Sequence, residues 1–337
     1  MAHGSPVAEP AAPDSPPPKP ASVPEPPAPP STVPEPTGLE PSRAAPAHTH
    51  GPLVAPEVLL AHLEDPDLRL ADVRWYLAKP GDGRAAYEAG HIPGAVFVDL
   101  DTDLSASTGS GRHPLPDPAA FAARLGALGF GTDDWIVAYD DVGGTVAARL
   151  WWMLDDLGHP RVGVLDGGLA AWLAIGGPLT TEVPVRPPAR LELAARWRKI
   201  IDREALRRRL GSVVLLDGRA PERYRGEVEP VDPAAGHIPT ARSAPVTANL
   251  RPDGRFRPGP ELRQRFVELG CEGRPVVVSC GSGTNACHHA IAMRLAGLPD
   301  PVLYPGSFSD WSRAGLPVVT GEEPGDPPAG GRAEPAS

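Results

Sequence analysis

A cysteine at the end of an apolar run has the surroundings that point most clearly to chemistry. Residues 276–278 are all valine and predict a buried strand, Cys280 closes this stretch, and residues 281–283 have no bulky side chains. In such a turn, successive backbone N–H groups can curl around the sulfur and meet the start of the next helix, which favours an anion. The thiolate is the nucleophilic form of cysteine. We therefore expect Cys280 to attack a sulfur atom.

Strand-like and helix-like stretches alternate around this turn and must position it. Helical composition over residues 118–128, 147–157, 260–269 and 286–295 alternates with short apolar runs. This alternation predicts parallel strands joined by helical crossovers, an open α/β sheet with helices on both faces. Ligands of such sheets bind at the carboxyl ends of strands, where Cys280 is expected to lie.

Four sequence features occur twice in the same order, which predicts two duplicated halves. The first copy reads Leu70-Ala-Asp-Val-Arg74, Gly90-His-Ile-Pro-Gly-Ala95, Trp135-Ile-Val-Ala-Tyr-Asp140 and Val164-Leu-Asp-Gly-Gly-Leu-Ala-Ala-Trp172. The second reads Leu215-Leu-Asp-Gly-Arg219, Gly236-His-Ile-Pro-Thr-Ala241, Val276-Val-Val-Ser-Cys280 and Leu303-Tyr-Pro-Gly-Ser-Phe-Ser-Asp-Trp311. Asp140 stands where the second half has Cys280, and a carboxylate cannot act as a sulfur nucleophile.

Composition marks the expected boundaries. Residues 1–52 are rich in Pro, Ala, Glu and Ser and predict a disordered arm, either a docking tail for a Pro-binding module or a solvated extension. The inactive first half is expected over 53–182, a Pro-rich linker over 183–196, the catalytic second half over 197–320 and a disordered tail over 321–337.

Charge and hydropathy exclude several classes of protein. The net charge of −10 over 337 residues, with no basic patch containing interleaved aromatics, argues against a nucleic-acid surface. The start of the sequence has no basic region followed by an apolar stretch, and no segment approaches the length of a membrane span. We expect a cytoplasmic protein with neither a nucleic-acid nor a membrane partner.

The three cysteines argue against a disulfide framework, since an odd number fits a reducing compartment better. Cys287 precedes His288 and His289, but the spacing matches no zinc pattern and adjacent histidines on a helix point in different directions. We expect one of these three side chains to be packed and the others solvated, with no metal and no organic cofactor. Cys287 is expected to be a packed thiol, with a redox partner of Cys280 as the alternative, and the exposure of Cys271 stays open.

The paired His-Ile-Pro segments at 91–93 and 237–239, together with Asp166-Gly-Gly168 and Trp172, resemble the domain signatures of tandem-domain sulfurtransferases of the rhodanese superfamily. The resemblance covers about residues 53 to 320. It implies two rhodanese-like domains, the first inactive and the second catalytic, and sulfur transfer through a persulfide on Cys280. The implied acceptors are thioredoxin, another small thiol or cyanide.

The loop from Cys280 to Ala286 reads Cys-Gly-Ser-Gly-Thr-Asn-Ala and is similar to the Cys-Gly-Ser-Gly-Val-Thr-Ala loop of 3-mercaptopyruvate sulfurtransferases. Thiosulfate-specific relatives typically carry Arg and Lys at the positions of Gly281 and Ser282. The resemblance therefore implies 3-mercaptopyruvate as the donor. A thiosulfate:cyanide sulfurtransferase and a non-catalytic binding module remain alternatives, whereas a phosphatase loop would need Arg at position 286.

In the mercaptopyruvate branch, a relay serine is associated with an Asp and a His from the first domain. The segments 98–101 and 111–116 look like the parts that supply them, so Asp101, His113 and Ser282 form a candidate triad. Asp101 would orient His113, and His113 would polarise the Ser282 hydroxyl. The alternative is that His113 caps a loop while Asp101 binds backbone amides.

The donor carboxylate needs a cation, and Arg223 matches the substrate arginine of the family. Arg219 is the rival, but it is expected to pair with a carboxylate. Asp232 stands where mercaptopyruvate members often carry a second arginine, and Thr240 replaces the Gly of the second His-Ile-Pro-Gly. Backbone N–H groups would hold the persulfide in the loop formed by Gly281, Ser282, Gly283, Thr284, Asn285 and Ala286.

Overall fold

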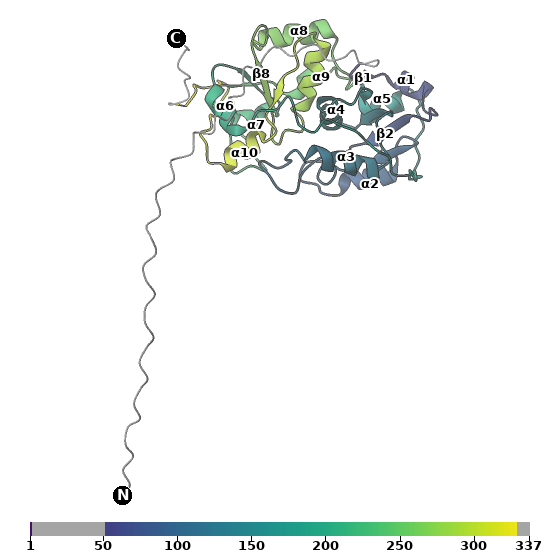
Figure 1. The fold of residues 1–337 in the computed structure, drawn as a ribbon. Coiled ribbons are helices and arrows are strands. Elements are labelled where there is room, and N and C mark those ends of the chain that lie inside the picture. Colours follow the sequence, from purple (N-terminus) through teal and green to yellow (C-terminus); the bar gives the residue numbers. More distant parts are fainter. Residues whose placement is uncertain (2–50, 329–337) are drawn as a thin grey trace, which may run out of the picture. The chain divides into compact units, whose positions relative to one another are not determined.

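The computed structural model describes Met1 and residues 51–328 (Figure 1). The predicted arm over 1–52 lies almost entirely outside the described residues, as does the predicted tail from residue 329 onward. The chain divides into two units, Met1–Leu39 and Glu40–Ser337, and every contact below belongs to the second. In the described range, no helix combines the length and the apolar composition that crossing a bilayer requires.

Five parallel strands form the sheet of domain 1 in the order β1-β5-β4-β2-β3. The central strand β4 is buried at every position, as expected for a parallel sheet with helices on both faces. The strands are β1 (Leu53–Val54), β2 (Leu68–Asp72), β3 (Ala95–Phe97), β4 (Trp135–Tyr139) and β5 (Val162–Leu165). The helices are α1 (Pro56–Ala61), α2 (Asp82–Ala89), α3 (Pro118–Ala127), α4 (Ala147–Asp156) and α5 (Gly168–Ala174).

Domain 2 repeats this design with four parallel strands in the order β7-β6-β8-β9. A single parallel bridge between Ile200 and Leu303 stands where domain 1 pairs β1 with β5. The strands are β6 (Val214–Asp217), β7 (Ala241–Ser243), β8 (Val276–Ser279) and β9 (Val302–Leu303). The helices are α6 (Arg203–Arg209), α7 (Pro221–Arg225), the 3-10 helix η1 (Val246–Asn249), α8 (Gly259–Glu268), α9 (Cys287–Leu295) and α10 (Ser307–Arg313).

These two sheets confirm the predicted α/β class with two domains, each an open parallel sheet flanked by helices. Four helices expected from composition are α3, α4, α8 and α9, and each observed end lies within about one residue of the expected one. Asp117 shows why α3 begins where it does, because its carboxylate accepts the backbone N–H groups of Ala119 and Ala120.

A buried ion pair recurs at the end of the first long strand of each domain. In domain 1, Arg74 Nη2 lies 2.6 Å from Asp72 Oδ2 and also donates to the Gly90 carbonyl. In domain 2, Arg219 Nη2 lies 2.7 Å from Asp217 Oδ2. The predicted pairing of Arg219 with a carboxylate is therefore correct, and this arginine ties its strand end to the following loop through the carbonyl of Gly236.

The two His-Ile-Pro segments serve packing. His91 stacks on Tyr87 with ring centroids 3.9 Å apart, and His237 stacks on Tyr224 at 3.7 Å. Each ring also places Nδ1 at 2.8 Å from the carbonyl oxygen of its tyrosine. Such doubled contacts explain why the motif occurs once in each half.

One hydrophobic cluster contains residues of both domains and joins them. Helices α4 and α9, which pack against each other, both contribute to it. Arg294 on α9 forms a bidentate pair with Asp155 on α4, at 2.7 and 2.8 Å, and lies over the Trp151 ring at 4.8 Å. Both domains therefore contribute to whatever lies at the start of α9.

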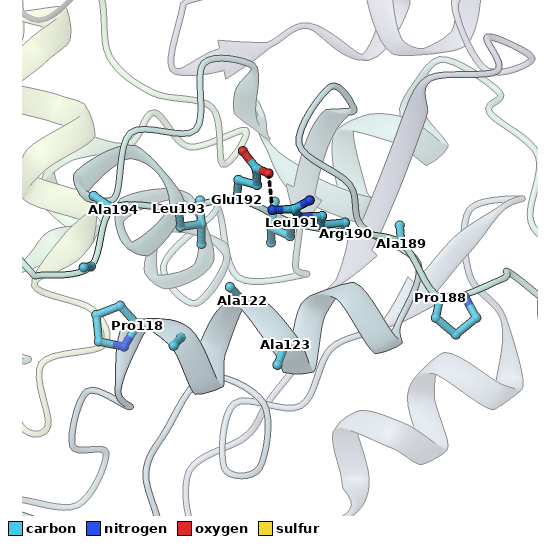
Figure 2. A pocket seen from close by; sticks show the side chains of 12 residues that line it. Pro118, Ala122, Ala123, Pro188, Ala189, Arg190, Leu191, Glu192, Leu193 and Ala194 are labelled. Atoms are coloured by element: carbon cyan, nitrogen blue, oxygen red, sulfur yellow. Dashed lines mark ion pairs between the residues drawn. The ribbon is translucent and has the colours of Figure 1, made fainter.

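The predicted linker lies against domain 1. The backbone N–H of Ala189 donates to the Gly126 carbonyl at 2.8 Å, at the end of α3. A groove of about 810 Å³ lies between α3 and residues 188–195, and Figure 2 shows the side chains that line it. Alanine and proline dominate its wall, and its one ion pair, Arg190 with Glu192, is exposed, so we assign no chemistry to it.

The expectation of a disordered tail from residue 321 is wrong at its start. The backbone N–H of Gly321 donates to the Arg225 carbonyl at 2.9 Å, and Thr240 donates to the Pro324 carbonyl at 2.6 Å. Residue 240 adopts a positive φ of 68° there. These bonds hold residues 321–324 on domain 2.

Candidate active site

The candidate nucleophile lies at the carboxyl end of β8, as expected. Cys280 follows the last residue of β8 and is 3% exposed. Its backbone N–H donates to Ser307 Oγ at 3.1 Å, and its carbonyl accepts the N–H of Phe308 at 3.0 Å. The start of α10 therefore fixes the first residue of the loop.

Glycine at position 283 is required by the shape of the loop. Gly283 has φ of 79°, a region that side chains disfavour. A Cβ there would also collide with the carbonyl oxygen of Pro305. The loop can therefore turn tightly between β8 and the start of α9 at Cys287.

The corresponding loop of domain 1 binds an anion of its own. Asp140 Oδ1 accepts the backbone N–H groups of Val142 and Gly144, at 2.9 and 2.8 Å. Its Oδ2 accepts those of Val146 and Ala147, at 2.8 and 2.9 Å. Burial raises the pKa of Asp140, and these four bonds oppose that rise. A loop of this design thus surrounds a negative group with its amides.

In domain 2, Cys280 follows strand β8 as Asp140 follows β4. None of the backbone N–H groups of residues 281–286 donates to a protein acceptor within residues 51–328. By analogy with Asp140, they are positioned to stabilise negative charge on the Cys280 sulfur or on a second sulfur bonded to it. The predicted loop residues Gly281, Gly283, Thr284, Asn285 and Ala286 form the connection between β8 and α9 that begins at the nucleophile.

The structure brings the three predicted triad residues together across the domain boundary. His113 Nδ1 lies 2.8 Å from Ser282 Oγ, and His113 Nε2 lies 3.0 Å from Asp101 Oδ1. Since a carboxylate only accepts, Nε2 carries the proton and Nδ1 accepts from the serine hydroxyl. Trp75 Nε1 donates to Asp101 Oδ2 at 3.0 Å, and Thr284 Oγ1 lies 3.3 Å from His113 Nδ1. Asp101 therefore accepts side-chain donors here, and backbone amides are not its partners.

Electrostatics keep this histidine neutral near pH 7. Burial lowers the pKa of His113, while its bond to Asp101 raises it less, so the net shift is downward. The same bond lowers the pKa of Asp101, whose side chain is half exposed. A neutral imidazole with a free Nδ1 lone pair can accept a proton from Ser282.

Arg223, the predicted substrate arginine, lies beside the loop. Its Nη2 donates to both carboxylate oxygens of Glu229, at 2.7 and 2.9 Å. Burial alone would raise the pKa of Glu229, but the N–H of Asp232 and the charge of Arg223 lower it overall. The other terminal nitrogen of Arg223 lies 3.4 Å from the point where a Cβ on Gly281 would stand. Arg223 is thus held by acids on one side and faces the loop on the other.

Arg149 is a residue that the sequence reasoning missed. It lies on α4 of domain 1 and is buried, with its guanidinium donating to the carbonyls of Gly283, Leu104 and His113 at 3.0 to 3.4 Å. Burial lowers its pKa, and the thiols of Cys287 and Cys280 oppose this. No carboxylate pairs with it in the described part of the chain. A charged residue on an otherwise apolar helix face was the available signal.

Arg112 was also missed, although it is adjacent to His113. It pairs with Asp232 of domain 2, and its backbone N–H donates to Ser309 Oγ at 3.1 Å. A Cβ on Gly281 would stand only 2.6 Å from Arg112 Nη2. The carboxylate at position 232, which departs from the family pattern, thus binds an arginine of the other domain.

The remaining cysteines are buried. Cys271 is 3% exposed, and burial raises its pKa to about 11. The Sγ of Cys287 lies 3.3 Å from the carbonyl oxygen of Gly283, and burial raises the pKa of this thiol to about 12. The expectation of solvated neighbours is wrong, because His288 and His289 are also buried, packed on the rings of Phe256 and Phe266 of the same domain. No group of metal-ligating side chains occurs within residues 51–328.

Comparison with known proteins agrees with this geometry. The rhodanese-like domain family matches residues 55–175 and 202–314. A probable 3-mercaptopyruvate sulfurtransferase of Pseudomonas aeruginosa is 48% identical over 280 residues, covering 80% of this chain and 98% of that protein. A putative thiosulfate sulfurtransferase, SseB of Mycobacterium tuberculosis, is 43% identical over 252 residues, which cover 72% of this chain and 87% of that protein. The crystal structure of SseA, a 3-mercaptopyruvate sulfotransferase from Escherichia coli, superposes with a TM-score of 0.68 at 31% identity, covering 77% of this chain and all of that one. The chain therefore belongs to the rhodanese-like family, as a tandem-domain sulfurtransferase.

Proposed function

We propose that this sulfurtransferase takes sulfane sulfur from 3-mercaptopyruvate, holds it as a persulfide on Cys280 and passes it to a thiol or cyanide. The observation that carries the proposal is the hydrogen-bonded chain from Ser282 through His113 to Asp101. Ser282 lies two positions after the nucleophile Cys280. A donor that must exchange protons during C–S cleavage needs such a relay. Thiosulfate does not, because its leaving sulfite takes up no proton at carbon.

The first half-reaction begins with the Cys280 thiolate. It attacks the donor sulfur, an S–S bond forms and the C–S bond breaks, leaving its electron pair on carbon as the enolate of pyruvate. Ser282 and neutral His113 accept the proton of the donor thiol and return a proton to the enolate carbon, which releases pyruvate. The free amides of residues 281–286 support the proposed negative charge on the outer sulfur of the persulfide.

The second half-reaction regenerates the thiol. An acceptor thiolate, or cyanide, attacks the outer sulfur, so that a new bond to the acceptor forms and the Cys280 thiolate leaves. Thioredoxin, another small thiol and cyanide are the acceptors we propose, in the cytoplasm and without a metal or organic cofactor. Asp140 supports an inactive role for the first domain, since a carboxylate occupies the position of the nucleophile.

Donor-specific kinetics test this choice. We expect kcat/KM for 3-mercaptopyruvate to exceed that for thiosulfate, with cyanide as the common acceptor. The opposite order would favour the thiosulfate:cyanide alternative, which the two arginines near Gly281 make chemically reasonable for a sulfonate. Treatment with donor alone should add the mass of one sulfur to the wild-type chain and nothing to Cys280→Ser. If the wild-type mass stays unchanged, a non-catalytic binding module becomes the better interpretation.

A further inference from the structure

Two guanidinium groups from different domains converge on Gly281. A Cβ added to this glycine would lie 2.6 Å from Arg112 Nη2 and 3.4 Å from Arg223 Nη1. Gly281 follows the nucleophile directly in sequence. The two cations therefore flank the space beside the reacting sulfur, one from each side of the domain boundary.

Both arginines have nitrogen atoms to spare on the side of the loop. Arg112 uses Nη1 to bind Asp232, and Arg223 uses Nη2 to bind Glu229. Within residues 51–328, the hydrogen bonds of the two guanidinium groups run from Arg112 Nη1 and from Arg223 Nη2, so Arg112 Nη2 and Arg223 Nη1 are left for another acceptor. The Nε atoms of both side chains are buried without a partner. A buried Nε–H without an acceptor is costly, so a ligand whose oxygens reach the Nε and free Nη edge of either guanidinium gains affinity.

Asp232 connects the two cations. Its Oδ1 pairs with Arg112 and its Oδ2 lies 3.4 Å from Arg223 Nη2. The side chain of Asp232 is fully buried, and those of Arg112 and Arg223 are nearly so, at 13% and 14% exposed. A single carboxylate thus holds both guanidinium groups on the side away from Gly281, and their other edges face Gly281.

The main chain of Arg112 is equally constrained. Its N–H is bonded to Ser309 of α10, and the preceding Gly111 has φ of 84° with no room for a Cβ beside Gly306. Domain 1 therefore delivers this side chain to the catalytic loop on a fixed segment, the same one that carries His113.

We infer that Arg112 binds the carboxylate of the sulfur donor together with Arg223, so that domain 1 completes the substrate site as well as the proton relay. The inference rests on the proposed function, since it needs a donor whose carboxylate lies away from the transferred sulfur. Two forked cations can each give a carboxylate oxygen two hydrogen bonds and fix the orientation of the C–S bond. Because Asp232 and Glu229 offset both charges in the free protein, recognition depends on the unpaired N–H groups more than on net charge.

The test compares 3-mercaptopyruvate with mercaptoacetone, which has the same thiol and ketone but no carboxylate, and with thiosulfate. We expect Arg112→Gln in the full chain to raise KM for 3-mercaptopyruvate about 10- to 100-fold, the loss typical of a charge-assisted hydrogen bond, with little change in kcat. Kinetics with mercaptoacetone should stay within about twofold. Arg112→Lys, which keeps the charge and loses the fork, should fall between these values.

Asp232→Asn separates binding from structure. This substitution removes the same ion pair as Arg112→Gln but keeps both arginines. Because it also removes one negative charge beside them, KM for 3-mercaptopyruvate should fall or stay unchanged. Arg161→Gln, which breaks a surface pair with Asp67 far from the loop, should behave as wild type. Equal kinetic effects of Arg112→Gln and Asp232→Asn would overturn the inference, because they would reveal an ion pair with a purely structural role.

The arms also distinguish failure of the inference from failure of the proposed function. Wild-type protein that takes no sulfur from 3-mercaptopyruvate overturns both. Wild-type turnover with an unchanged ratio of 3-mercaptopyruvate to mercaptoacetone in Arg112→Gln overturns the inference alone. A loss confined to thiosulfate would assign the two arginines to a sulfonate, and this too would contradict the carboxylate site.

Discussion

His113 of domain 1 lies with its Nδ1 at 2.8 Å from the Oγ of Ser282 in domain 2. This contact makes the reacting loop a joint product of the two halves, although only one of them carries a nucleophile. Domain 1 supplies Asp101, His113 and Arg149 around the loop and so takes part in building the site.

Removal of the relay hydroxyl should slow the first half-reaction. We expect Ser282→Ala to lower kcat with 3-mercaptopyruvate by about 100-fold or more, the range for loss of general acid–base assistance. Thiosulfate turnover, which needs no proton at carbon, should change much less. Steady-state assays with both donors measure this, with the exposed Ser212→Ala as a control for hydroxyl loss. An equal loss with both donors would mean that Ser282 shapes the loop and does not relay protons.

The pH profile should report on His113. The relay needs a neutral ring, and burial lowers the pKa of His113, so kcat/KM for 3-mercaptopyruvate should hold through about pH 6.5, the ordinary histidine pKa, and decline only at more acid pH. Asp101 raises the pKa of His113, so Asp101→Asn should move this acid limb to still lower pH while kcat drops, because the ring loses its orienting acceptor. Profiles of kcat/KM from pH 5 to 8 decide the sign. A limb that moves to higher pH in Asp101→Asn would contradict the assignment.

Two buried histidines should make the protein sensitive to acid. Burial lowers the pKa of His288 to about 3 and that of His289 well below its ordinary value. In the unfolded chain both titrate near 6.5, so below that pH the unfolded state binds protons that the folded state excludes. Stability should therefore fall as pH drops from about 6.5 toward 3, by at most about 1.4 kcal/mol per pH unit for each ring.

Urea unfolding at pH 7, 6 and 5 measures this dependence. His288→Gln should flatten it by about one proton relative to wild type. His62→Gln is the matched control, because that ring is half exposed and should leave the slope near the wild-type value. If His288→Gln keeps the full wild-type slope, the acid sensitivity has another source.

Local patterns in the sequence predicted much of the molecule. The valines before Cys280, the doubled His-Ile-Pro segments and the apolar helices are features of neighbouring residues, and they located β8, the duplication and α9. The parallel direction of the strands in each sheet followed from the alternation of apolar runs and helical stretches, whereas their order within each sheet came only from the structure. The triad residues could be chosen from resemblance, because their segments carry recognisable neighbours.

Contacts between the halves could not be predicted in this way. Arg112 and Arg149 act through partners that are 120 and 134 positions away, Asp232 and Gly283, and only the docked domains create those pairs. The burial of His288 and His289 could not be predicted either, because α9 packs against α8 and η1 of its own domain as well as against α4 of domain 1. An apolar pattern with a period of about 3.6 residues predicts one buried face of a helix such as α9, and it does not reveal a second face that polar residues such as histidine occupy.

Asp140 offers a test of the anion-binding design without touching the nucleophile. Replacing it with alanine leaves four buried amides without their acceptor, so Asp140→Ala should reduce the free energy of unfolding by roughly 2–5 kcal/mol. The exposed Asp133→Ala serves as the control for loss of a carboxylate next to β4.

Thermal unfolding of these proteins, measured with and without sulfate, tests whether the amides bind an external anion. If these amides form an anion site, sulfate should raise the Tm of Asp140→Ala by more than it raises that of wild type or Asp133→Ala, because the ion replaces the missing carboxylate. The same increment in all three proteins would mean that the amides need their own side chain and bind no external anion, and the analogy between Asp140 and a persulfide on Cys280 would lose its support.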